Sequence, residues 1–180
     1  MRQHGPWQIV RSHNVYSDPW VGVRKDDVIR PDGKPGTYSL VTLKPGVCVA
    51  ATDEDGHVYL TEEFHYGVGR TTIEAVSGGT EPGEDALLTA QRELREEIGI
   101  EAATWTDLGV VDPFTANVVS PTRLYRARDL SFFGHAPEGT EVIRCVKMAL
   151  TEAVRMVLRS EITHGPSAVL LLKLRLMELA

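Results

Sequence analysis

The segment that most constrains this chain is a glycine-containing loop followed by a helix with two distinct sides, GGTEPGEDALLTAQRELREEIGI, residues 78–100. The spacing after the glycine and proline residues predicts a helix that opens near Glu84 and stops at Gly99. At about 100° per residue, three large apolar side chains fall on one side of this helix: Leu87, Leu94 and Ile98. The pattern therefore predicts an amphipathic helix that packs against a core.

A strip of carboxylates lies beside the apolar side of this helix. Glu93 and Glu97 are four residues apart, and Glu96 is three residues from Glu93. Like charges at this spacing repel each other and weaken an isolated helix. A hard divalent cation such as Mg²⁺ would reverse that repulsion, because it binds through carboxylate oxygens. The alternative for such a charged run is a solvated surface helix.

The same segment matches, position by position, the box G-x5-E-x7-R-E-U-x-E-E-x-G-U of the Nudix hydrolases, where U is a bulky aliphatic residue. The match is carried by Gly78, Glu84, Arg92, Glu93, Leu94, Glu96, Glu97, Gly99 and Ile100. The chain thus resembles this family, and the resemblance implies an α/β/α sandwich with a mixed sheet.

The resemblance also implies roles for individual residues. It makes Glu93 and Glu97 the principal ligands of Mg²⁺, or of Mn²⁺ in its place, and Glu96 a further ligand in the catalytic site. The backbone carbonyl of Ser77, just before the box, would complete the metal shell. Gly78, Glu84 and Arg92 would be structural, since the guanidinium of Arg92 can hold the nearby carboxylates in place. For Glu84, an indirect role at the metal is the alternative.

Before the box, the chain divides at Pro45-Gly46. Three strand-like segments, residues 7–16, 20–30 and 37–43, precede that point, and they predict a small N-terminal antiparallel sheet. We therefore expect an N-terminal β-strand segment over 1–45, serving dimerisation and substrate binding, and a Nudix catalytic domain over 46–180.

The second part alternates strands with a few helices. Strands are predicted over residues 47–52, 58–64, 72–76, 105–111, 122–127 and 142–150, and helices over 152–159 and from Pro166 onward. The last helix should dock through one face, made of Val169, Leu172, Leu176 and Leu179. Strands on both sides of an early helix, with helices again at the end, predict an α+β fold in which a mixed sheet is covered on both faces.

Within the family, the chain is similar to the ADP-ribose pyrophosphatase group over nearly its full length. The run TTIEAVSGG resembles the sequence that leads into that group's box, with Val76 and Ser77 in place of its usual proline and alanine. His65 stands where an arginine often reaches the diphosphate of the substrate, and Arg70 closes the same run. Several relatives form a homodimer by exchanging N-terminal strands, and they stack the purine between aromatic side chains; Trp20 and Tyr38 stand at the matching positions.

The general base in that group is a glutamate in the long loop after the box, just ahead of a strand. The run APEGTEVIRCV offers Glu138 and Glu141, and Glu141 aligns better because it directly precedes the strand. A solvated loop acid is the alternative for either residue.

Composition narrows the class of partner. The net charge of −6, without a long basic run, argues against nucleic acid, and the longest apolar run, AVLLL, is too short to cross a membrane. Cys48 and Cys145 lie in apolar strand-like runs and are expected to be small buried residues. With a polar N-terminus as well, these features predict a cytoplasmic protein with a small-molecule nucleotide as its ligand.

The function expected from these observations is Mg²⁺-dependent hydrolysis of a nucleoside diphosphate linked to a sugar. ADP-ribose, cleaved to AMP and ribose 5-phosphate, is the first expectation, and GDP-mannose or another nucleotide sugar is the second. Two alternatives of other classes are a Nudix-fold regulator without catalysis and a hydrolase of RNA ends. All the box glutamates are present, which argues against the regulator, and the acidic balance argues against RNA.

Overall fold

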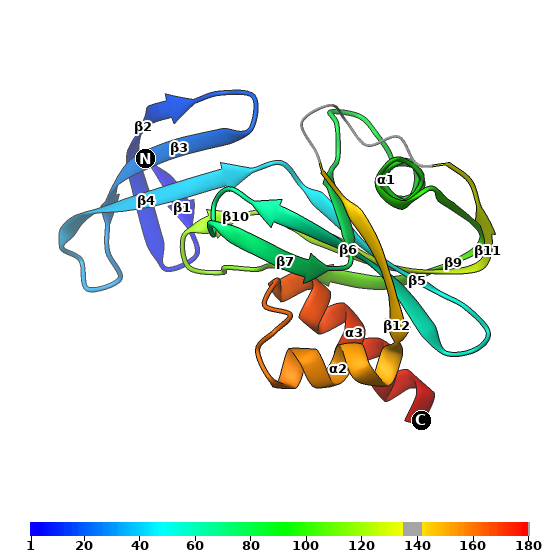
Figure 1. The fold of residues 1–180 in the computed structure, drawn as a ribbon. Helices are drawn as coiled ribbons and strands as arrows, with labels where there is room; N and C mark the ends of the chain where they lie inside the picture. Colours follow the sequence, from blue (N-terminus) through cyan, green and yellow to red (C-terminus); the bar gives the residue numbers. More distant parts are fainter. Residues whose placement is uncertain (135–141, 180) are drawn as a thin grey trace. The chain divides into compact units, whose positions relative to one another are not determined.

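The computed structural model describes residues 1–134 and 142–179, and it divides into two compact units. Unit 1 contains Met1–Pro45 together with Asp112–Ser120, and unit 2 contains Gly46–Val111 together with Pro121–Ala180. Each unit has its own sheet, and Figure 1 labels most of the strands and the helices.

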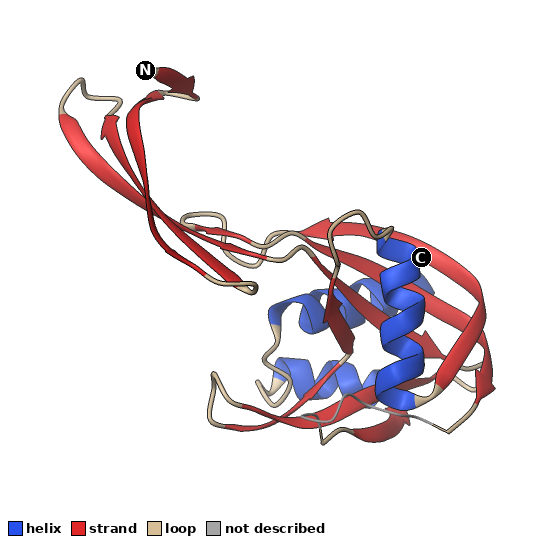
Figure 2. Cartoon of the chain, turned by 90° about the horizontal axis from the view of Figure 1, so that it is seen from above, coloured by secondary structure: helices blue, strands red, loops and turns tan. Residues whose placement is uncertain are grey.

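Unit 1 is a five-stranded sheet in the order β1-β2-β3-β4-β10. Its strands are β1 (Arg2–His4), β2 (Trp7–Ser17), β3 (Val21–Ile29), β4 (Pro35–Leu43) and β10 (Val118–Val119). The first four are antiparallel, as the sequence predicts, and β2 to β4 form the long curved strands of Figure 2. A tight turn joins β3 to β4, where Gly33 has a φ of 78° that favours glycine.

The short strand β10 brings residues from far along the chain into unit 1. Val118 and Val119 pair in parallel with Val41 and Thr42 of β4. The backbone N–H of Val41 also donates to the carbonyl of Asn117 at 2.8 Å. Residues 112–120 therefore belong with the N-terminal sheet, a pairing between distant segments that the residue pattern of the chain does not display.

Unit 2 is built on a mixed seven-stranded sheet. Its strands are β5 (Gly46–Thr52), β6 (His57–His65), β7 (Arg70–Glu74), β8 (Val76–Gly79), β9 (Ile100–Val111), β11 (Thr122–Phe132) and β12 (Arg144–Ala149). The order is β12-β6-β5-β11-β9, with β7 paired to β6 and β8 paired to β5. Among the strand pairs of this sheet that the structure describes, β5 and β11 are parallel and the others are antiparallel. The predicted mixed sheet is therefore confirmed.

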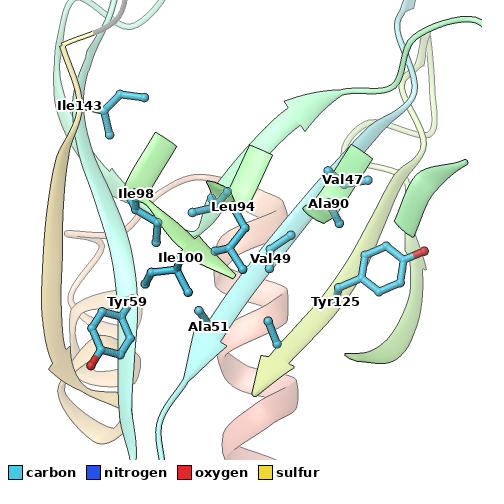
Figure 3. Packing of buried hydrophobic residues seen from close by; sticks show 12 residues of the cluster. Val47, Val49, Ala51, Tyr59, Ala90, Leu94, Ile98, Ile100, Tyr125 and Ile143 are labelled. Carbon is cyan, nitrogen blue, oxygen red and sulfur yellow. The ribbon is translucent and has the colours of Figure 1, made fainter. Parts of the chain in front are cut away.

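The helix predicted from the carboxylate-rich segment is α1 (Ala86–Ile98), and it packs on one face of this sheet. Asp85 caps its N-terminus by accepting the N–H of Leu87 at 2.8 Å, and Gly99 ends it with a left-handed φ of 65°. The buried cluster beneath it is shown in Figure 3, where α1 contributes Ala90, Leu94 and Ile98. Leu94 and Ile98 were predicted to lie on the apolar side, and both are buried.

The other face carries α2 (Leu150–Leu158) and α3 (Gly165–Leu179), so helices cover both faces of the sheet (Figure 1). The predicted docking face of α3 is wrong. Leu170, Leu171 and Leu174 are fully buried, whereas Val169, Leu176 and Leu179 are exposed and Leu172 is only half-buried. Apolar residues surround this helix on most sides, so spacing alone did not distinguish the buried face.

The two cysteines differ in their surroundings. Cys48 is buried as expected, but Cys145 is exposed on β12, which corrects the expectation for that residue. Cys145 lies in a strand at the end of the strand order, where one face of the strand has little covering it. Among the helices of residues 1–134 and 142–179, none is long and apolar enough to cross a membrane.

Candidate active site

The glycine before α1 is required by the close approach of a glutamate. Gly78 lies on β8, and a Cβ added to it would stand 2.0 Å from the Cδ of Glu93 and 2.1 Å from its Oε1. Real contacts of a Cβ are never that short, so the Glu93 carboxylate occupies the space that a side chain at position 78 would need. Gly78, the first glycine of the box, thus packs directly against Glu93, the first candidate metal ligand, and this contact joins β8 to α1.

Arg92 ties the glutamates of the box together. Its Nη1 lies 2.8 Å from Oε1 of Glu93 and 3.0 Å from Oε2 of Glu96. Its Nε donates to Oε1 of Glu84 at 3.2 Å, and its Nη2 donates to the carbonyl of Gly79 at 3.4 Å. Such charge-assisted bonds hold several groups at once because the guanidinium is planar and has five donors. The network lowers the pKa of Glu84 to about 2, chiefly through the bond from Arg92, and raises the pKa of Arg92.

The three candidate ligands differ in exposure. Glu97 is buried with 8% of its surface exposed, the Glu93 side chain is 14% exposed, and that of Glu96 is 39% exposed. Acceptor oxygens on a half-buried strip suit a divalent cation that keeps some of its water. Ser77, whose carbonyl is the expected fourth donor, lies on β8 opposite Cys48 of β5.

A tighter trio of possible ligand atoms occurs in the turn between β5 and β6. In the described part of the chain, only Asp53, Asp55 and His57 bring three such atoms within 4.8 Å of one another. The local backbone explains this trio, because Asp53 accepts the N–H groups of Asp55 and His57 at 3.1 and 2.9 Å. Asp53 also pairs with Lys147 at 2.8 Å. Burial raises the pKa of the Asp53 carboxyl, but Lys147 contributes to a larger opposing effect, so the net shift is downward. The hydrogen bonds of the turn and the ion pair with Lys147 therefore explain why these three side chains lie close together.

His65 and Arg70 lie at the two ends of the hairpin between β6 and β7. His65 Nε2 lies 3.3 Å from Oε1 of Glu74, and Arg70 donates to the hydroxyl of Thr163 at 2.7 Å. His164 reaches the same Glu74 carboxylate at 3.1 Å, although ninety-nine positions separate it from His65 in the chain. Sequence reasoning did not connect these two histidines, since no HxH or HxxxH spacing links them.

The two aromatic candidates occupy different places in unit 1. Trp20 is 68% exposed just before β3, whereas Tyr38 is half-buried on β4 and packs edge-to-face on Trp7. Tyr38 pairs with Asp26 across the strands, six residues from Trp20, which corresponds to about 20 Å along a strand. One sheet therefore does not bring Trp20 and Tyr38 together. The two candidates for the general base, Glu138 and Glu141, lie outside the described residues.

Two family models match this chain, and they meet close to the point where unit 1 gives way to unit 2 after Pro45. The family model of the NUDIX domain matches residues 42–167, and that of the nucleoside diphosphate sugar hydrolase N-terminal domain matches residues 7–41. The chain is 30% identical to an ADP-ribose pyrophosphatase of Mycobacterium tuberculosis (strain ATCC 25618 / H37Rv), covering 92% of this chain and 81% of the relative. It is 26% identical to an ADP-ribose pyrophosphatase of Bacillus subtilis (strain 168), covering 94% and 92%.

Two further proteins, one of them a solved structure, align with nearly the whole chain. A methanol dehydrogenase activator of Bacillus methanolicus is 25% identical over 94% of this chain and 92% of its own length. The crystal structure of an ADP compounds hydrolase superposes with a TM-score of 0.82 at 20% identity, covering 97% of this chain and 95% of the other, which shows a shared fold. With the box running from β8 through α1 to the start of β9, and the NUDIX match spanning most of its length, this chain belongs to the NUDIX family and is a hydrolase of pyrophosphate bonds.

Proposed function

We propose that this hydrolase cleaves the diphosphate of a nucleoside diphosphate sugar, with ADP-ribose as its substrate. Water adds to one phosphorus while the bond from that phosphorus to the bridging oxygen breaks, which yields AMP and ribose 5-phosphate. The relatives named as ADP-ribose pyrophosphatases support this substrate, and they align over more than nine-tenths of the chain. GDP-mannose, or another nucleotide sugar, is the alternative, because Val76, Ser77 and His65 depart from the pattern of the ADP-ribose group.

The observation that carries the proposal is the packing of Glu93 against Gly78 inside the Arg92 network. This packing holds a carboxylate at the junction of strand and helix, beside Glu96 and Glu97. The donor set fits Mg²⁺ or Mn²⁺, since it consists of carboxylate oxygens with a backbone carbonyl close by in the chain. Bound there, a divalent cation would neutralise diphosphate oxygens and lower the pKa of the attacking water.

The remaining groups of the chain would position the substrate and take its proton. Glu141 would accept the proton of the attacking water, with Glu138 as the alternative base. His65 and Arg70 are candidates to donate hydrogen bonds to the diphosphate, and they share one hairpin. Arg92 and Glu84 would keep the ligand carboxylates in place without touching substrate.

Substrate identity is tested by a screen of purified protein. ADP-ribose, GDP-mannose, UDP-glucose, NADH and diadenosine polyphosphates would be incubated with Mg²⁺ or with Mn²⁺, and the products identified by mass. We expect the highest kcat/KM for ADP-ribose, with AMP and ribose 5-phosphate as products. A higher kcat/KM for GDP-mannose would transfer the proposal to that substrate. Turnover that persists after chelation and dialysis would contradict the metal site.

We also propose a homodimer in which unit 1 contributes to base binding, because Trp20 and Tyr38 lie far apart in one sheet. A second copy would supply the missing aromatic partner for the base. Deleting residues 1–44 should abolish the dimer in sedimentation analysis and raise KM sharply. A monomeric truncated protein with a normal KM would refute this arrangement.

A further inference from the structure

The end of β6 directs polar side chains to the face of the sheet that α1 covers. Leu60 packs in the buried cluster on the side of α2 and α3, whereas Tyr59 packs in the cluster on the side of α1. Successive side chains of a strand point to opposite faces, so Glu63 and His65 lie on the same face as Tyr59. His65 is therefore on the side of the sheet that also carries the box carboxylates of α1.

The neighbouring strand β7 adds to these polar side chains. Across the antiparallel pair, Arg70 stands opposite His65, Thr72 opposite Glu63, and Glu74 opposite Thr61. Residues directly opposite each other project from the same face. The β6–β7 strip is defined here by its residues Glu63, His65, Arg70, Thr72 and Glu74. With its imidazole neutral, this strip carries two carboxylates and one guanidinium, an excess of negative charge that opposes the binding of an anion.

The carboxylate of Glu74 is held from three directions. Nε2 of His65 lies 3.3 Å from its Oε1, and the hydroxyl of Thr72 donates to the same oxygen at 2.6 Å. Nδ1 of His164 lies 3.1 Å from the other oxygen, Oε2. An ionised carboxylate can only accept hydrogen bonds, so Nε2 of His65 and Nδ1 of His164 each carry a hydrogen. Glu74 thereby fixes which nitrogen of each ring is the donor.

This arrangement determines how His65 meets a diphosphate. Its side chain is 36% exposed, so a ligand has access to the ring. In a neutral imidazole with hydrogen on Nε2, the other nitrogen, Nδ1, is an acceptor. The oxygens of an ionised diphosphate are acceptors as well, so His65 can donate to them through Nδ1 only after it has gained a proton. The Glu74 carboxylate favours that proton, because an opposite charge stabilises the charged form of a histidine.

The other titratable groups around Glu74 stay neutral at neutral pH. Burial lowers the pKa of His164, His65 lowers it further, and Glu74 offsets only part of this effect. Nδ1 of His164 also lies 2.8 Å from the hydroxyl of Ser167, and Cys48 lies 3.8 Å from that hydroxyl. Burial raises the pKa of the Cys48 thiol to about 12. His65 is therefore the member of this cluster that is placed to gain a proton when an anion binds.

We propose that Glu74 is a positioning residue for His65, and that His65 takes up one proton from solvent as the diphosphate binds. The inference rests on the proposed function, in which His65 contacts the diphosphate, and adds the protonation and the residue that supports it. The proton adds to Nδ1, and no covalent bond to the substrate forms or breaks in this step. Binding that takes up a proton weakens as pH rises, whereas an arginine at position 65 would carry its charge at every pH.

The experiment measures proton uptake by calorimetry, in two buffers of different ionisation enthalpy, with Mg²⁺ present. The ligands are the α,β-methylene analogues of ADP-ribose and of GDP-mannose, which are not hydrolysed and whose diphosphate group does not titrate near neutral pH. We expect an uptake of roughly 0.5 to 1 proton per analogue bound at pH 8, and an affinity that falls about 3- to 10-fold from pH 7.5 to pH 8.5. Binding without proton uptake would overturn the inference and leave the proposed function standing. If neither analogue binds, both are overturned.

Two matched variants identify the histidine that takes the proton. His65→Gln places an amide nitrogen where Nε2 stands and cannot gain a proton, so uptake should fall below about 0.2 proton. His164→Asn places an amide nitrogen where Nδ1 stands and should retain the uptake of the unaltered protein. Any proton exchange at the metal is common to all of these proteins, so the difference between variants is the readout. Uptake that persists in His65→Gln would overturn the inference.

A third variant tests the role of Glu74. Glu74→Gln keeps the size of the side chain but removes the charge that stabilises the imidazolium, so uptake at pH 8 should fall to less than about half. His65→Arg should bind the analogues with no uptake and with an affinity that is the same at pH 7.5 and pH 8.5. Unchanged uptake in Glu74→Gln would show that Glu74 is merely structural and would overturn its assignment. If Glu74→Gln does not fold, the comparison of His65→Gln with His164→Asn decides.

Discussion

Replacing Gly78 by alanine should displace the Glu93 side chain, and it should lower activity more than it lowers the stability of the fold. The added Cβ would stand 2.0 Å from the Glu93 carboxyl carbon, whereas ordinary contact begins at 3.4 Å. The carboxyl group must therefore move by at least about 1.4 Å. Gly78 does not have a left-handed backbone conformation, so alanine itself is not strained there.

The size of the effect follows from this displacement. A misplacement of about 1 Å in a catalytic group costs on the order of 10²-fold in rate, which corresponds to about 2.7 kcal/mol of transition-state stabilisation. Overpacking of a well-filled site costs about 1–3 kcal/mol, and here the flexible end of a glutamate side chain can yield. We therefore expect kcat/KM to fall by at least about 10²-fold, with a loss of about 1–2 kcal/mol in the free energy of unfolding.

The assay measures initial rates over a range of Mg²⁺ concentrations together with urea unfolding. Gly165→Ala is the control, since a Cβ at Gly165 meets nothing within 4 Å; kcat/KM should stay unchanged, and the free energy of unfolding should rise by no more than about 1 kcal/mol because Gly165 begins a helix. Adding Glu93→Ala to Gly78→Ala should restore stability but not activity, because it removes the side chain that is displaced. A value of kcat/KM for Gly78→Ala within about threefold of the unaltered protein would refute the reasoning.

Three further predictions concern single carboxylates. Glu97→Gln should lower kcat/KM by about 10²-fold or more without unfolding, because the amide keeps the size of a direct ligand and loses its charge; rates at limiting Mg²⁺ and circular dichroism check this. Glu141→Gln should lower kcat by roughly 10²- to 10⁴-fold without changing metal affinity, while Glu138→Gln should have a small effect, and a crippled Glu138→Gln would reverse the assignment of the base. Glu84, whose pKa is lowered from 4.5 to about 2 by Arg92, stabilises the fold above its unfolded pKa and loses that contribution as pH falls toward 2. Glu84→Gln should thus be less stable than the unaltered protein at pH 7, and most of this difference should disappear at pH 2 in urea titrations; a difference as large at pH 2 as at pH 7 would contradict the linkage.

The helix α1 and the positions of the candidate ligands on it could be predicted from the sequence because their determinants are local. The spacing of Leu94 and Ile98 marks one face, the glycine and proline residues before Glu84 and Gly99 after Ile98 mark the ends, and the three glutamates lie within about one turn. Backbone hydrogen bonds within a helix join residues four apart, so short-range pattern is sufficient to predict such an element. The antiparallel N-terminal strands were predictable for a similar reason, since a short turn with Asp-Gly joins two of them.

Only the tertiary structure decided which surfaces of these elements are buried and which distant groups meet. The face of α3 that docks depends on the shape of the sheet beneath it, and an apolar helix offers more than one such face. The meeting of His65 and His164 on Glu74 depends on where α3 begins relative to β7. Arg24 and Asp26 alternate along one strand like any polar pair, and only the tertiary structure shows that Nε of Arg24 and Oδ1 of Asp26 are buried without a hydrogen-bond partner. Burial and the cost of an unpaired charge arise from packing between segments far apart in the chain, so no local pattern records them.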